Sequence, residues 1–502
     1  MGFTLFARVG AAFGAPLTLA NLGDRLGAMW GGRVLVDEPY RRTLTGSQIA
    51  DLVVGWSNAI ASLSEPGERV VLATPNSYDQ FLLCLAVSRA GRIAVPVNSQ
   101  MRPAEVDHVV SDSGAGLVLR SVDELDDAVA SAPPCIPATP EPGEVAALFY
   151  TSGTTGKPKG AALTHKGLMG EARFGALAPT ELVDVGVVVS LPVAHIFGFV
   201  MLLSLATSGM RVCFLPRFKA SEVLDLIESR RSTGFIGVPS MYRMLLEAGA
   251  AERDLSCVRF WGSGADAMPA ELAQTFKKLG ASANLPIIGT VGDALFIEGY
   301  GMVEIGGAAA IKVSLPRVPE RLGQNLAFRM PGYKFRVVGL DGNEVPTGEM
   351  GELQLTGPGV LKEYWNAPEA TRGAMTDDGW LRTGDLVRLS RLGTITFCGR
   401  QKHVIKSGGY SVYPLEVELT LEEHPEVLEA AVVGKDDPKL GLVPVAAVRL
   451  APRATVTPED LVAWGRERLS SYKAPREVVV VDELPRTGTA KLQKDRIEEF
   501  FR

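Results

Sequence analysis

The chain has 502 residues, of which 46% are hydrophobic and 22% charged, and its formal net charge at pH 7 is -6. This length exceeds what one hydrophobic core usually supports, so we expect two or more domains. The acidic balance gives no broad basic field and argues against a nucleic-acid partner.

The cysteines and the N-terminus indicate a reduced, cytoplasmic protein. Five cysteines are scattered without CxxC spacing, which predicts neither a disulfide framework nor a metal site. The first apolar stretch contains Arg8 and is soon followed by Pro16 and Asp24, a pattern unlike a signal peptide or a membrane-spanning helix. Peripheral membrane contact and the oligomeric state are left open.

Residues 1–145 alternate strand-like and helix-like segments. Short runs rich in β-formers cover 69–73, 93–97 and 117–120, and an apolar helix pattern covers 78–90 after the potential N-cap Ser77. This alternation predicts a mostly parallel sheet with buried helices. A proline-rich loop at 131–143 leads into the next strand.

A loop between two apolar strands, 146–150 and 161–163, carries the strongest motif of the chain. Its ten residues include three glycines, four hydroxyl side chains and two lysines, which suit the binding of an anion by backbone N–H groups, hydroxyls and ammonium groups. We interpret it as a phosphate loop at a sheet edge. In order, its residues are Thr151, Ser152, Gly153, Thr154, Thr155, Gly156, Lys157, Pro158, Lys159 and Gly160.

Two commoner phosphate motifs do not fit this loop. A Walker loop needs four residues between its glycines and a Ser or Thr after its lysine, whereas two residues separate Gly153 from Gly156 and Pro158 follows Lys157. The dinucleotide fingerprint also fails. A flexible linker is the plain alternative, but linkers rarely join two apolar strands directly.

The alternation continues with predicted strands at 185–191, 211–215 and 235–238 and helices at 197–206 and 221–230. His195 follows the first of these strands, and ligands of α/β folds usually bind at strand ends. Two glycine-rich strings come next. The small residues permit close backbone approach to a flat base, Tyr300 can stack on it and Glu304 can hold a hard cation. The strings contain Gly262, Ser263, Gly264 and Ala265, then Tyr300, Gly301, Met302, Val303 and Glu304.

The last 170 residues or so change character twice. From 333 to 399, short strands and tight turns predict a small β-rich subdomain, where Asp385 can accept both hydroxyls of a ribose and Arg400 can hold its phosphate side. Beyond Arg400, a helix from Pro414, strands at 430–433 and 445–448 and a capped helix at Thr457 predict a further domain. The loop 484–491 of this domain presents Lys491.

The phosphate loop resembles, almost residue for residue, the signature of the adenylate-forming superfamily, which includes acyl-CoA and aryl-CoA ligases, luciferases and adenylation domains of peptide synthetases. From Arg69 onward the motifs follow the family order, and the chain is most similar to bacterial fatty-acyl-CoA ligases. The resemblance implies an α/β fold with a large N-terminal domain of mostly parallel sheets, helices and a small β-rich subdomain at 1–399. A hinge at 400–402 and a small mobile α+β domain at 403–502 follow.

The resemblance also implies roles for particular residues. Lys491 is the catalytic lysine, His195 lies beside the acyl carboxylate, and Thr154 and Glu304 coordinate Mg²⁺. The loop from Thr151 to Lys159 binds the phosphates of ATP, the two glycine-rich strings bind the base, and Asp385 and Arg400 bind ribose and phosphate. The remaining expected residues are the hinge Lys402, the catalytic residue Lys406 with Gly408 and Gly409 on the pantetheine side, and the apolar acid pocket with Phe197, Val238, Met241 and Tyr242.

The implied reaction joins a carboxylic acid to the α-phosphorus of ATP, releases pyrophosphate and passes the acyl group from acyl-AMP to coenzyme A. The apolar pocket favours a fatty or aryl acid. Val303 replaces the usual threonine and Ala490 the usual glycine, so a weakened adenylate-binding paralogue stays an alternative. Loading of a carrier protein, an aryl-CoA ligase and an unrelated kinase that forms ADP are the others.

Overall fold

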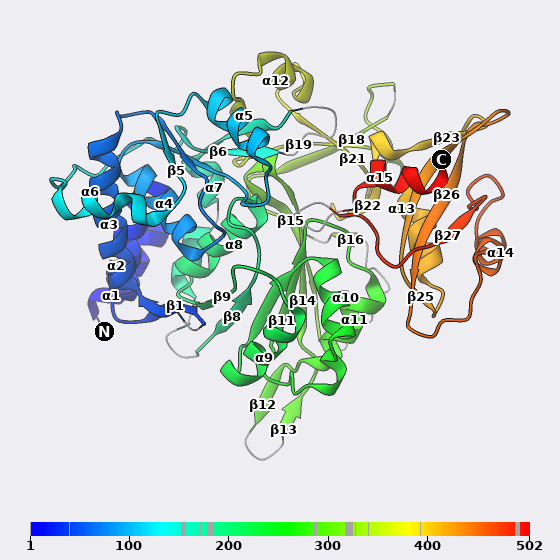
Figure 1. Cartoon of the computed structure of the whole chain (residues 1–502), viewed down its shortest axis with the longest axis horizontal. Coiled ribbons are helices and arrows are strands. Elements are labelled where there is room, and N and C mark those ends of the chain that lie inside the picture. The colour runs from blue at the N-terminus through cyan, green and yellow to red at the C-terminus, as the bar shows by residue number, and fades with distance from the viewer. Residues whose placement is uncertain are drawn as a thin grey trace. The chain divides into compact units, whose positions relative to one another are not determined.

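The computed structural model describes residues 2–39, 41–151, 157–170, 172–178, 180, 184–285, 289–316, 325–326, 328–339, 341–391, 393–486 and 492–502 (Figure 1). The chain forms two compact units. The first comprises Met1–Arg321, Phe328–Lys334 and Thr356–Leu381, and the second Leu322–Ala327, Phe335–Leu355 and Arg382–Arg502. The second unit includes strands that precede residue 399, and a functional division at 399 stays a prediction. Among the described helices, none is both long and apolar enough to cross a membrane.

A six-stranded sheet of the first unit contains the strands on both sides of the phosphate loop. Its order is β20-β7-β6-β4-β3-β5, in which β3, β4, β5 and β6 run parallel and β7 returns antiparallel beside β6. The predicted strands of this part are therefore present. Their bounds are β3 Arg69–Leu72, β4 Ile93–Pro96, β5 Leu117–Leu119, β6 Val145–Thr151, β7 Lys159–Thr164 and β20 Glu363–Tyr364.

Helix α4 (Tyr78–Arg89) shows why this sheet is buried. Ser77 caps the helix by accepting a hydrogen bond from the backbone N–H of Gln80, and every residue of the helix is buried. A helix that is enclosed on all sides needs apolar residues on all faces, which the sequence provides at 81–87. Together with the parallel strands, this arrangement confirms the α/β class.

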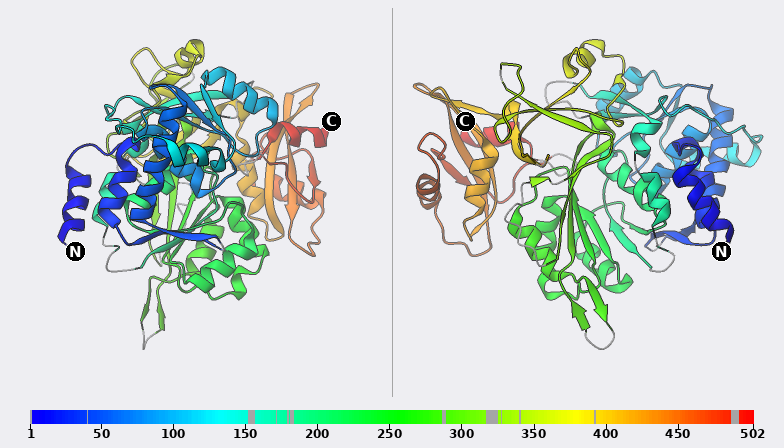
Figure 2. Two further views of the ribbon diagram at one scale, coloured as in Figure 1. Left: turned by 60° about the vertical axis from the view of Figure 1, so that its left-hand side comes forward. Right: turned by 180° about the vertical axis from the view of Figure 1, so that it is seen from behind.

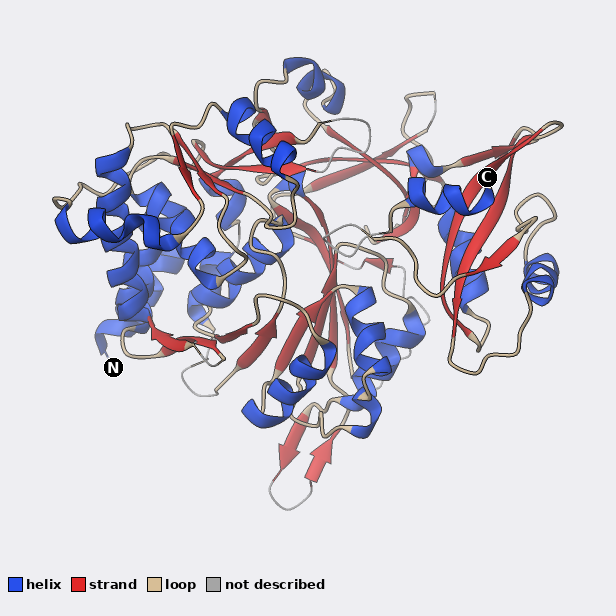
Figure 3. Ribbon diagram, viewed as in Figure 1, coloured by secondary structure: helices blue, strands red, loops and turns tan. Residues whose placement is uncertain are grey.

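A nine-stranded sheet forms the centre of the first unit, with the order β17-β15-β14-β11-β10-β8-β9-β1-β2 (Figure 3). The six strands from β14 to β1 are parallel, and antiparallel strands close both edges. The bounds are β1 Val34–Glu38, β2 Arg42–Thr45, β8 Gly186–Val189, β9 Arg211–Phe214, β10 Gly234–Gly237, β11 Phe260–Gly264, β14 Leu295–Met302, β15 Gly307–Ser314 and β17 Phe328–Arg329.

The strand order of this sheet reverses at β8. From β8 the chain passes to β9 on one side, then returns to β10 on the other side and continues through β11 to β14. In open α/β sheets the chain leaves two such neighbouring strands toward opposite faces, and a crevice opens beyond their carboxyl ends. The topology therefore singles out the ends of β8 and β10 as a ligand site.

Helices of the first unit lie beside these sheets. Figure 2 shows α9, α10 and α11 beside the nine-stranded sheet from two further directions. The remaining α-helices are α1 Gly2–Phe13, α2 Leu19–Trp30, α3 Gly46–Leu63, α5 Pro103–Ser113, α6 Asp126–Ser131, α7 His165–Met169, α8 Ile196–Thr207, α9 Ala220–Arg230, α10 Pro239–Glu247, α11 Ala270–Leu279 and α12 Pro368–Ala374. Short 3-10 helices and one hairpin complete the unit: η1 Val122–Leu125, η2 Ala172–Leu177, η3 Ala250–Glu252, η4 Val303–Ile305, β12 Ala283–Leu285 and β13 Gly289–Val291.

The second unit contains two five-stranded sheets, one ordered β16-β22-β21-β19-β18 and the other built on β24-β23-β26-β25 with β27 beside β26. Its helices are α13 Pro414–Glu422, α14 Pro458–Arg468, α15 Lys494–Glu498, η5 Gln401–His403 and η6 Glu499–Phe501. The strands are β16 Asn325–Leu326, β18 Lys334–Val338, β19 Met350–Thr356, β21 Leu381–Leu389, β22 Ile395–Arg400, β23 Ile405–Ser407, β24 Tyr410–Val412, β25 Val427–Asp437, β26 Gly441–Leu450 and β27 Val478–Val480.

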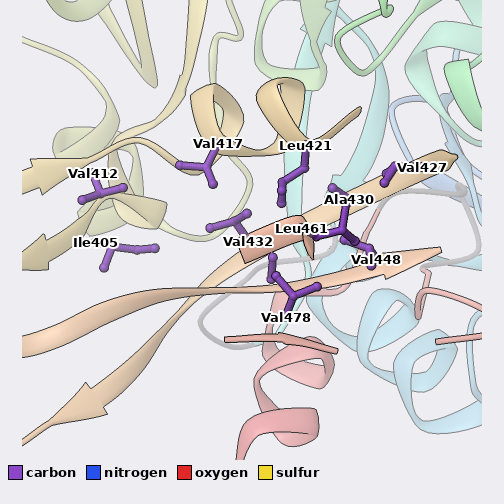
Figure 4. Packing of buried hydrophobic residues seen from close by; sticks show 11 residues of the cluster. Ile405, Val412, Val417, Leu421, Val427, Ala430, Val432, Val448, Leu461 and Val478 are labelled. Carbon is purple, nitrogen blue, oxygen red and sulfur yellow. The ribbon is translucent and has the colours of Figure 1, made fainter. Parts of the chain in front are cut away.

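Strand alternation gives the second of these sheets a core on each face. Ala430 and Val432 of β25 pack with Val417 and Leu421 of α13 on one face (Figure 4). The alternate residues Ala431 and Val433 belong to the core on the other face. Helices α15 and η6 complete that core with Ile497 and Phe501. Successive side chains of a strand point to opposite faces, so one apolar run serves both cores.

Burial of His165 predicts a loss of stability in mild acid. The Nδ1 atom of His165 accepts a hydrogen bond from the backbone N–H of Leu19 at 3.3 Å, and burial lowers the pKa of the ring from 6.5 to about 4. Between these pH values the unfolded chain binds a proton that the folded chain does not, so the stability is complete above pH 6.5 and falls as the pH approaches 4.

We expect this loss to reach about 3 kcal/mol, because 1.36 kcal/mol corresponds to one pKa unit. Urea unfolding between pH 4.5 and 7.5 measures it, with His165→Asn as the comparison. The difference between the two proteins should shrink as the pH falls. Parallel pH profiles of the two proteins would contradict the assignment.

Candidate active site

The phosphate hairpin is formed by β6, the loop and β7. Thr151 lies opposite Lys159 at the loop end of the hairpin, and residues 152–156 of the predicted loop lie outside the described residues. Lys157 and Lys159 are exposed, and the Nζ atom of Lys159 lies 5.7 Å from the centre of the Tyr364 ring. Two exposed ammonium groups at the loop are available to an anion.

Tyr364 connects this hairpin to Glu304, a link that the sequence did not predict. Strand β20 pairs with β7, with Tyr364 opposite Ala161, and the Tyr364 hydroxyl donates a hydrogen bond to Oε1 of Glu304 at 2.8 Å. Burial and the Glu304 carboxylate raise the pKa of Tyr364, so the phenol keeps its proton and stays a donor. Lys159, Tyr364 and Glu304 are therefore linked in the first unit by a cation–π contact and a hydrogen bond, and we call this series the polar chain.

His195 and Phe197 lie where the chain leaves β8. His195 is the N-cap residue of α8, and its Nδ1 atom accepts a hydrogen bond from the backbone N–H of Phe197 at 3.3 Å. In the neutral ring this acceptor role leaves the proton on Nε2. A Cβ atom placed on Gly264 would lie 3.0 Å from the Phe197 ring, so the ring covers the end of β11.

Val238 and Met241 lie where the chain leaves β10, on the opposite face. A Cβ atom placed on Gly237 would lie 3.2 Å from the Met241 sulfur, and Gly237 is opposite Ser263 in the ladder. Gly264 follows Ser263 in the strand, so its Cβ position faces the opposite side of the sheet. That is the side that Phe197 covers. Phe197, Val238 and Met241 therefore lie just beyond the carboxyl ends of β8 and β10, and their role as walls of an acid pocket stays a prediction.

Tyr242 requires a correction, because the structure places it in the core and not on a pocket wall. Its side chain is completely buried, and its hydroxyl donates to the backbone oxygen of Gly262 at 2.7 Å. The ring packs against Trp261 and Phe276 of neighbouring elements, with centroid separations of 6.1 and 4.8 Å. Tyr242 therefore holds β11 from the side of the aromatic core.

The expected base loop follows β11. Gly262, Ser263 and Gly264 are the last residues of the strand, and Ala265 then has a φ of +69°, a left-handed conformation that costs free energy for a residue with a Cβ. Across the ladder, Gly264 lies opposite Gly299, which leads to Tyr300 through β14. The two glycine-rich strings predicted to bind the base are therefore neighbours in the sheet.

Gly301 holds the second string in place through close backbone contact. A bulge separates Tyr300 from Gly301 in the pairing with β15, and a Cβ atom on Gly301 would lie 2.0 Å from the backbone oxygen of Gly307. Met302 ends β14, and Val303 and Glu304 continue as η4. The conformation that orients Glu304 thus depends on a residue without a side chain.

Gly301→Ala should therefore destabilise the first unit by about 1 to 3 kcal/mol and weaken ATP binding, because β14 and β15 must separate to admit the methyl group. Gly299→Ala is the matched control, since no atom lies within 4 Å of its would-be Cβ. Urea unfolding and ATP titration measure the two effects. Equal stability of the two variants would contradict the proposed constraint.

In the second unit, Asp385 and Arg400 are paired across β21 and β22, with Arg400 Nε 3.0 Å from Asp385 Oδ1. The Asp385 side chain is only 2% exposed, and Thr383 accepts a hydrogen bond from its backbone N–H at 3.1 Å. The structure thus brings the two predicted ribose and phosphate residues together. Ribose binding by this buried carboxylate stays a prediction.

The expected hinge and pantetheine residues follow Arg400 closely in the sequence and belong to the second unit. Lys402 is an exposed residue of η5, and Lys406 of β23 donates to the Ser411 hydroxyl at 2.7 Å. Gly408 and Gly409 join β23 to β24 with positive φ values of 56° and 86°, as a two-residue hairpin turn requires. Lys491 lies outside the described residues.

Comparisons with known proteins agree with the motifs. A family model described as AMP-binding enzyme matches residues 27–365, and one described as AMP-binding enzyme C-terminal domain matches 416–491. A feruloyl-CoA synthase of Amycolatopsis sp is 32% identical, with 91% of this chain and 94% of that protein aligned. The long-chain-fatty-acid--CoA ligase FadD13 of Mycobacterium tuberculosis is 30% identical, with coverages of 87% and 88%.

The solved structures give the same result. The ATP-bound MatB of Rhodopseudomonas palustris matches with a TM-score of 0.80 at 26% identity, over 97% of this chain and 99% of that one. The chain therefore belongs to the AMP-binding enzyme family, the adenylate-forming superfamily that its motifs resemble. It is an AMP-forming acyl-CoA ligase.

Proposed function

We propose that this ligase activates an apolar carboxylic acid, fatty or aryl, as its acyl-AMP and then transfers the acyl group to coenzyme A. The observation that carries the proposal is the polar chain from Lys159 through Tyr364 to Glu304, which connects the phosphate hairpin with a carboxylate suited to a hard cation. The apolar residues Phe197, Val238 and Met241 at the crevice support the apolar acid.

The first step brings two anions together, the substrate carboxylate and the triphosphate. Lys157 and Lys159, with the hydroxyls and amides of residues 151–156, would hold the β- and γ-phosphates. Lys491 would bridge the carboxylate and the α-phosphate, and His195 would orient the carboxylate with its Nε2–H. Fixed donors of this kind stabilise charge that develops during attack, and their geometry requires no reorganisation at that moment.

The residues present fit a magnesium ion. Mg²⁺ in nucleotide sites usually takes one or two carboxylates together with phosphate oxygens, and Glu304 provides a half-buried carboxylate that Tyr364 orients. Thr154, which lies outside the described residues, would add a hydroxyl. When bound, the ion supplies positive charge that neutralises the phosphates. The described residues include no group of three His, Cys, Asp or Glu side chains that could hold a metal.

In the second step the thiol of coenzyme A attacks the carbonyl carbon of acyl-AMP, the bond to AMP breaks and the thioester forms. The hairpin with Lys406, Gly408 and Gly409 would face the pantetheine arm, since its glycines permit close backbone approach.

The cytoplasm is the proposed location of the enzyme.

Incubation with ATP, coenzyme A and a mixture of carboxylic acids, followed by mass spectrometry, tests the proposal. We expect acyl-AMP and acyl-CoA from apolar acids, together with AMP and pyrophosphate. Formation of ADP would identify a kinase, transfer only to a carrier protein would replace coenzyme A as acceptor, and binding of ATP without pyrophosphate release would identify a paralogue without activity.

Val303→Thr should raise the rate of adenylation by up to about tenfold, because the added hydroxyl would contact the α-phosphate and 1.4 kcal/mol corresponds to that factor. Valine and threonine have side chains of similar volume. Because Val303 is also only half-buried in η4 beside Glu304, the substitution should disturb the packing little. Pyrophosphate release in a single turnover measures it. An unchanged or lower rate would mean that the α-phosphate already has its donors.

A further inference from the structure

Two serine side chains at the crevice have buried hydroxyls that find no hydrogen-bond partner among the described residues. Ser190 is 4% exposed and Ser240 is 7% exposed. A third such serine, Ser263, belongs to the base loop. Buried hydroxyls are nearly always hydrogen-bonded, because water compensates them in the unfolded chain and nothing does in a dry interior. Buried hydroxyls without a partner in the protein are suited to a hydrogen bond with a bound molecule.

Both serines flank the position at which the strand order reverses. Ser190 directly follows the last residue of β8, and Ser240 is the second residue of α10, which begins just after β10. β8 and β10 are neighbouring parallel strands, with Val189 opposite Ile236, and neighbouring strands lie about 4.8 Å apart. Ser190 and Ser240 thus lie beyond the carboxyl ends of two neighbouring parallel strands, where the topology predicts a ligand crevice.

Position distinguishes this pair from Ser88, another unpaired buried hydroxyl in the described part of the chain. Ser88 is 2% exposed and lies within α4, between β3 and β4 of the other sheet. A hydroxyl there meets only packed protein. Ser190 and Ser240 instead lie at strand ends, where α/β sheets bind small molecules.

The polar surroundings of the pair favour an uncharged partner. Ser263 lies opposite Glu298, and the Nζ atom of Lys312 is 2.7 Å from Oε1 of Glu298. Both charges are buried and compensate each other, so the ion pair beside Ser263 has no net charge. Ser190 and Ser240 themselves would offer a second carboxylate or a sulfonate on the substrate no opposite charge.

We propose that Ser190 and Ser240 hydrogen-bond a neutral polar group, a hydroxyl or a carbonyl, on the otherwise apolar acid. This inference rests on the proposed function and narrows its substrate class: the preferred acid has an apolar body with one uncharged hydrogen-bonding substituent. A site built for such a group discriminates against the analogue without it, because the buried hydroxyls then stay unpaired. The serines are specificity-determining residues and take no part in the proton or phosphoryl chemistry.

The test compares 3-(4-hydroxyphenyl)propanoate with 3-phenylpropanoate and hydroxylated with plain fatty acids of equal length. We expect kcat/KM for pyrophosphate release to be at least about tenfold higher for one hydroxylated acid than for its analogue. Ser190→Ala and Ser240→Ala should reduce this ratio toward one, leave the KM for ATP unchanged and not lower the melting temperature. Ser88→Ala is the matched control and should keep the ratio.

Three results would overturn the inference. The first is equal kcat/KM for every hydroxylated acid and its analogue, and the second is an unchanged ratio in both serine variants. The third is a rise in the KM for ATP without a change in the ratio, which would assign the hydroxyls to the nucleotide. In all three cases pyrophosphate is still released, so the proposed function stands. Release with no acid at all would instead contradict the proposed function and this inference together.

Discussion

Replacement of Lys491 by alanine should lower the rate of acyl-adenylate formation by about 100- to 1,000-fold, the usual effect of removing one charge-stabilising donor at a reacting centre. Thioester formation from supplied acyl-AMP should stay largely intact. The reason is that Lys491 is expected to meet negative charge only while the carboxylate attacks the α-phosphate. Pyrophosphate release and thioester formation, measured separately, give the two rates.

Lys439→Ala is the control for loss of a lysine from the second unit, because Lys439 is exposed and precedes β26. It should leave both rates unchanged. A loss of similar size in both half-reactions of Lys491→Ala would show that Lys491 acts on structure or on substrate binding in general, and would contradict its assignment to the first step.

Lys402→Pro should have the opposite effect, with pyrophosphate release kept in the first turnover and acyl-CoA formation slowed by about tenfold or more. The loop of Lys491 would crowd the path of pantetheine, so we propose that the C-terminal domain rotates about Lys402 between the steps. Lys402 belongs to the 3-10 turn η5, where φ values near -60° are usual and proline's φ of about -65° fits. Proline would then hold the first-step conformation.

Lys402→Ala removes the charge but keeps the freedom of φ, so it should support both half-reactions. Rapid-quench measurement of each step distinguishes the variants. If proline slows thioester formation no more than adenylation, the rotation is wrong or its pivot lies at another residue.

Local sequence patterns were sufficient for several elements of each unit. The apolar runs around the phosphate loop appear as β6 and β7, and Ser77 and Thr457 cap α4 and α14 by accepting backbone N–H groups at the third position. These features depend on neighbours within a few residues. The chemistry of a glycine- and hydroxyl-rich loop is likewise local, and so the phosphate loop could be identified without any contact.

Features that depend on strand order could not be predicted. Tyr364 and Glu304 are 60 residues apart, and they meet because β20 pairs with β7. Strand β20 has only two residues and no sequence pattern of its own. Tyr242 looked like a pocket residue because it follows Val238 and Met241, but one residue along a helix turns a side chain by about 100°, here into the aromatic core. The crevice beside Ser190 and Ser240 likewise follows from the order of β8, β9 and β10.

The sheet of β25 and β26 has a consequence for protein engineering. Among the described residues, the side chains that form its two cores come from 405–501, and the helices that cover its faces come from that same stretch. A sheet whose two faces are both covered by its own chain has its main apolar surface buried within one stretch. This stretch should therefore be portable as a module: produced alone it should fold, and in chimaeras it should tolerate exchange between relatives whose acid specificities differ.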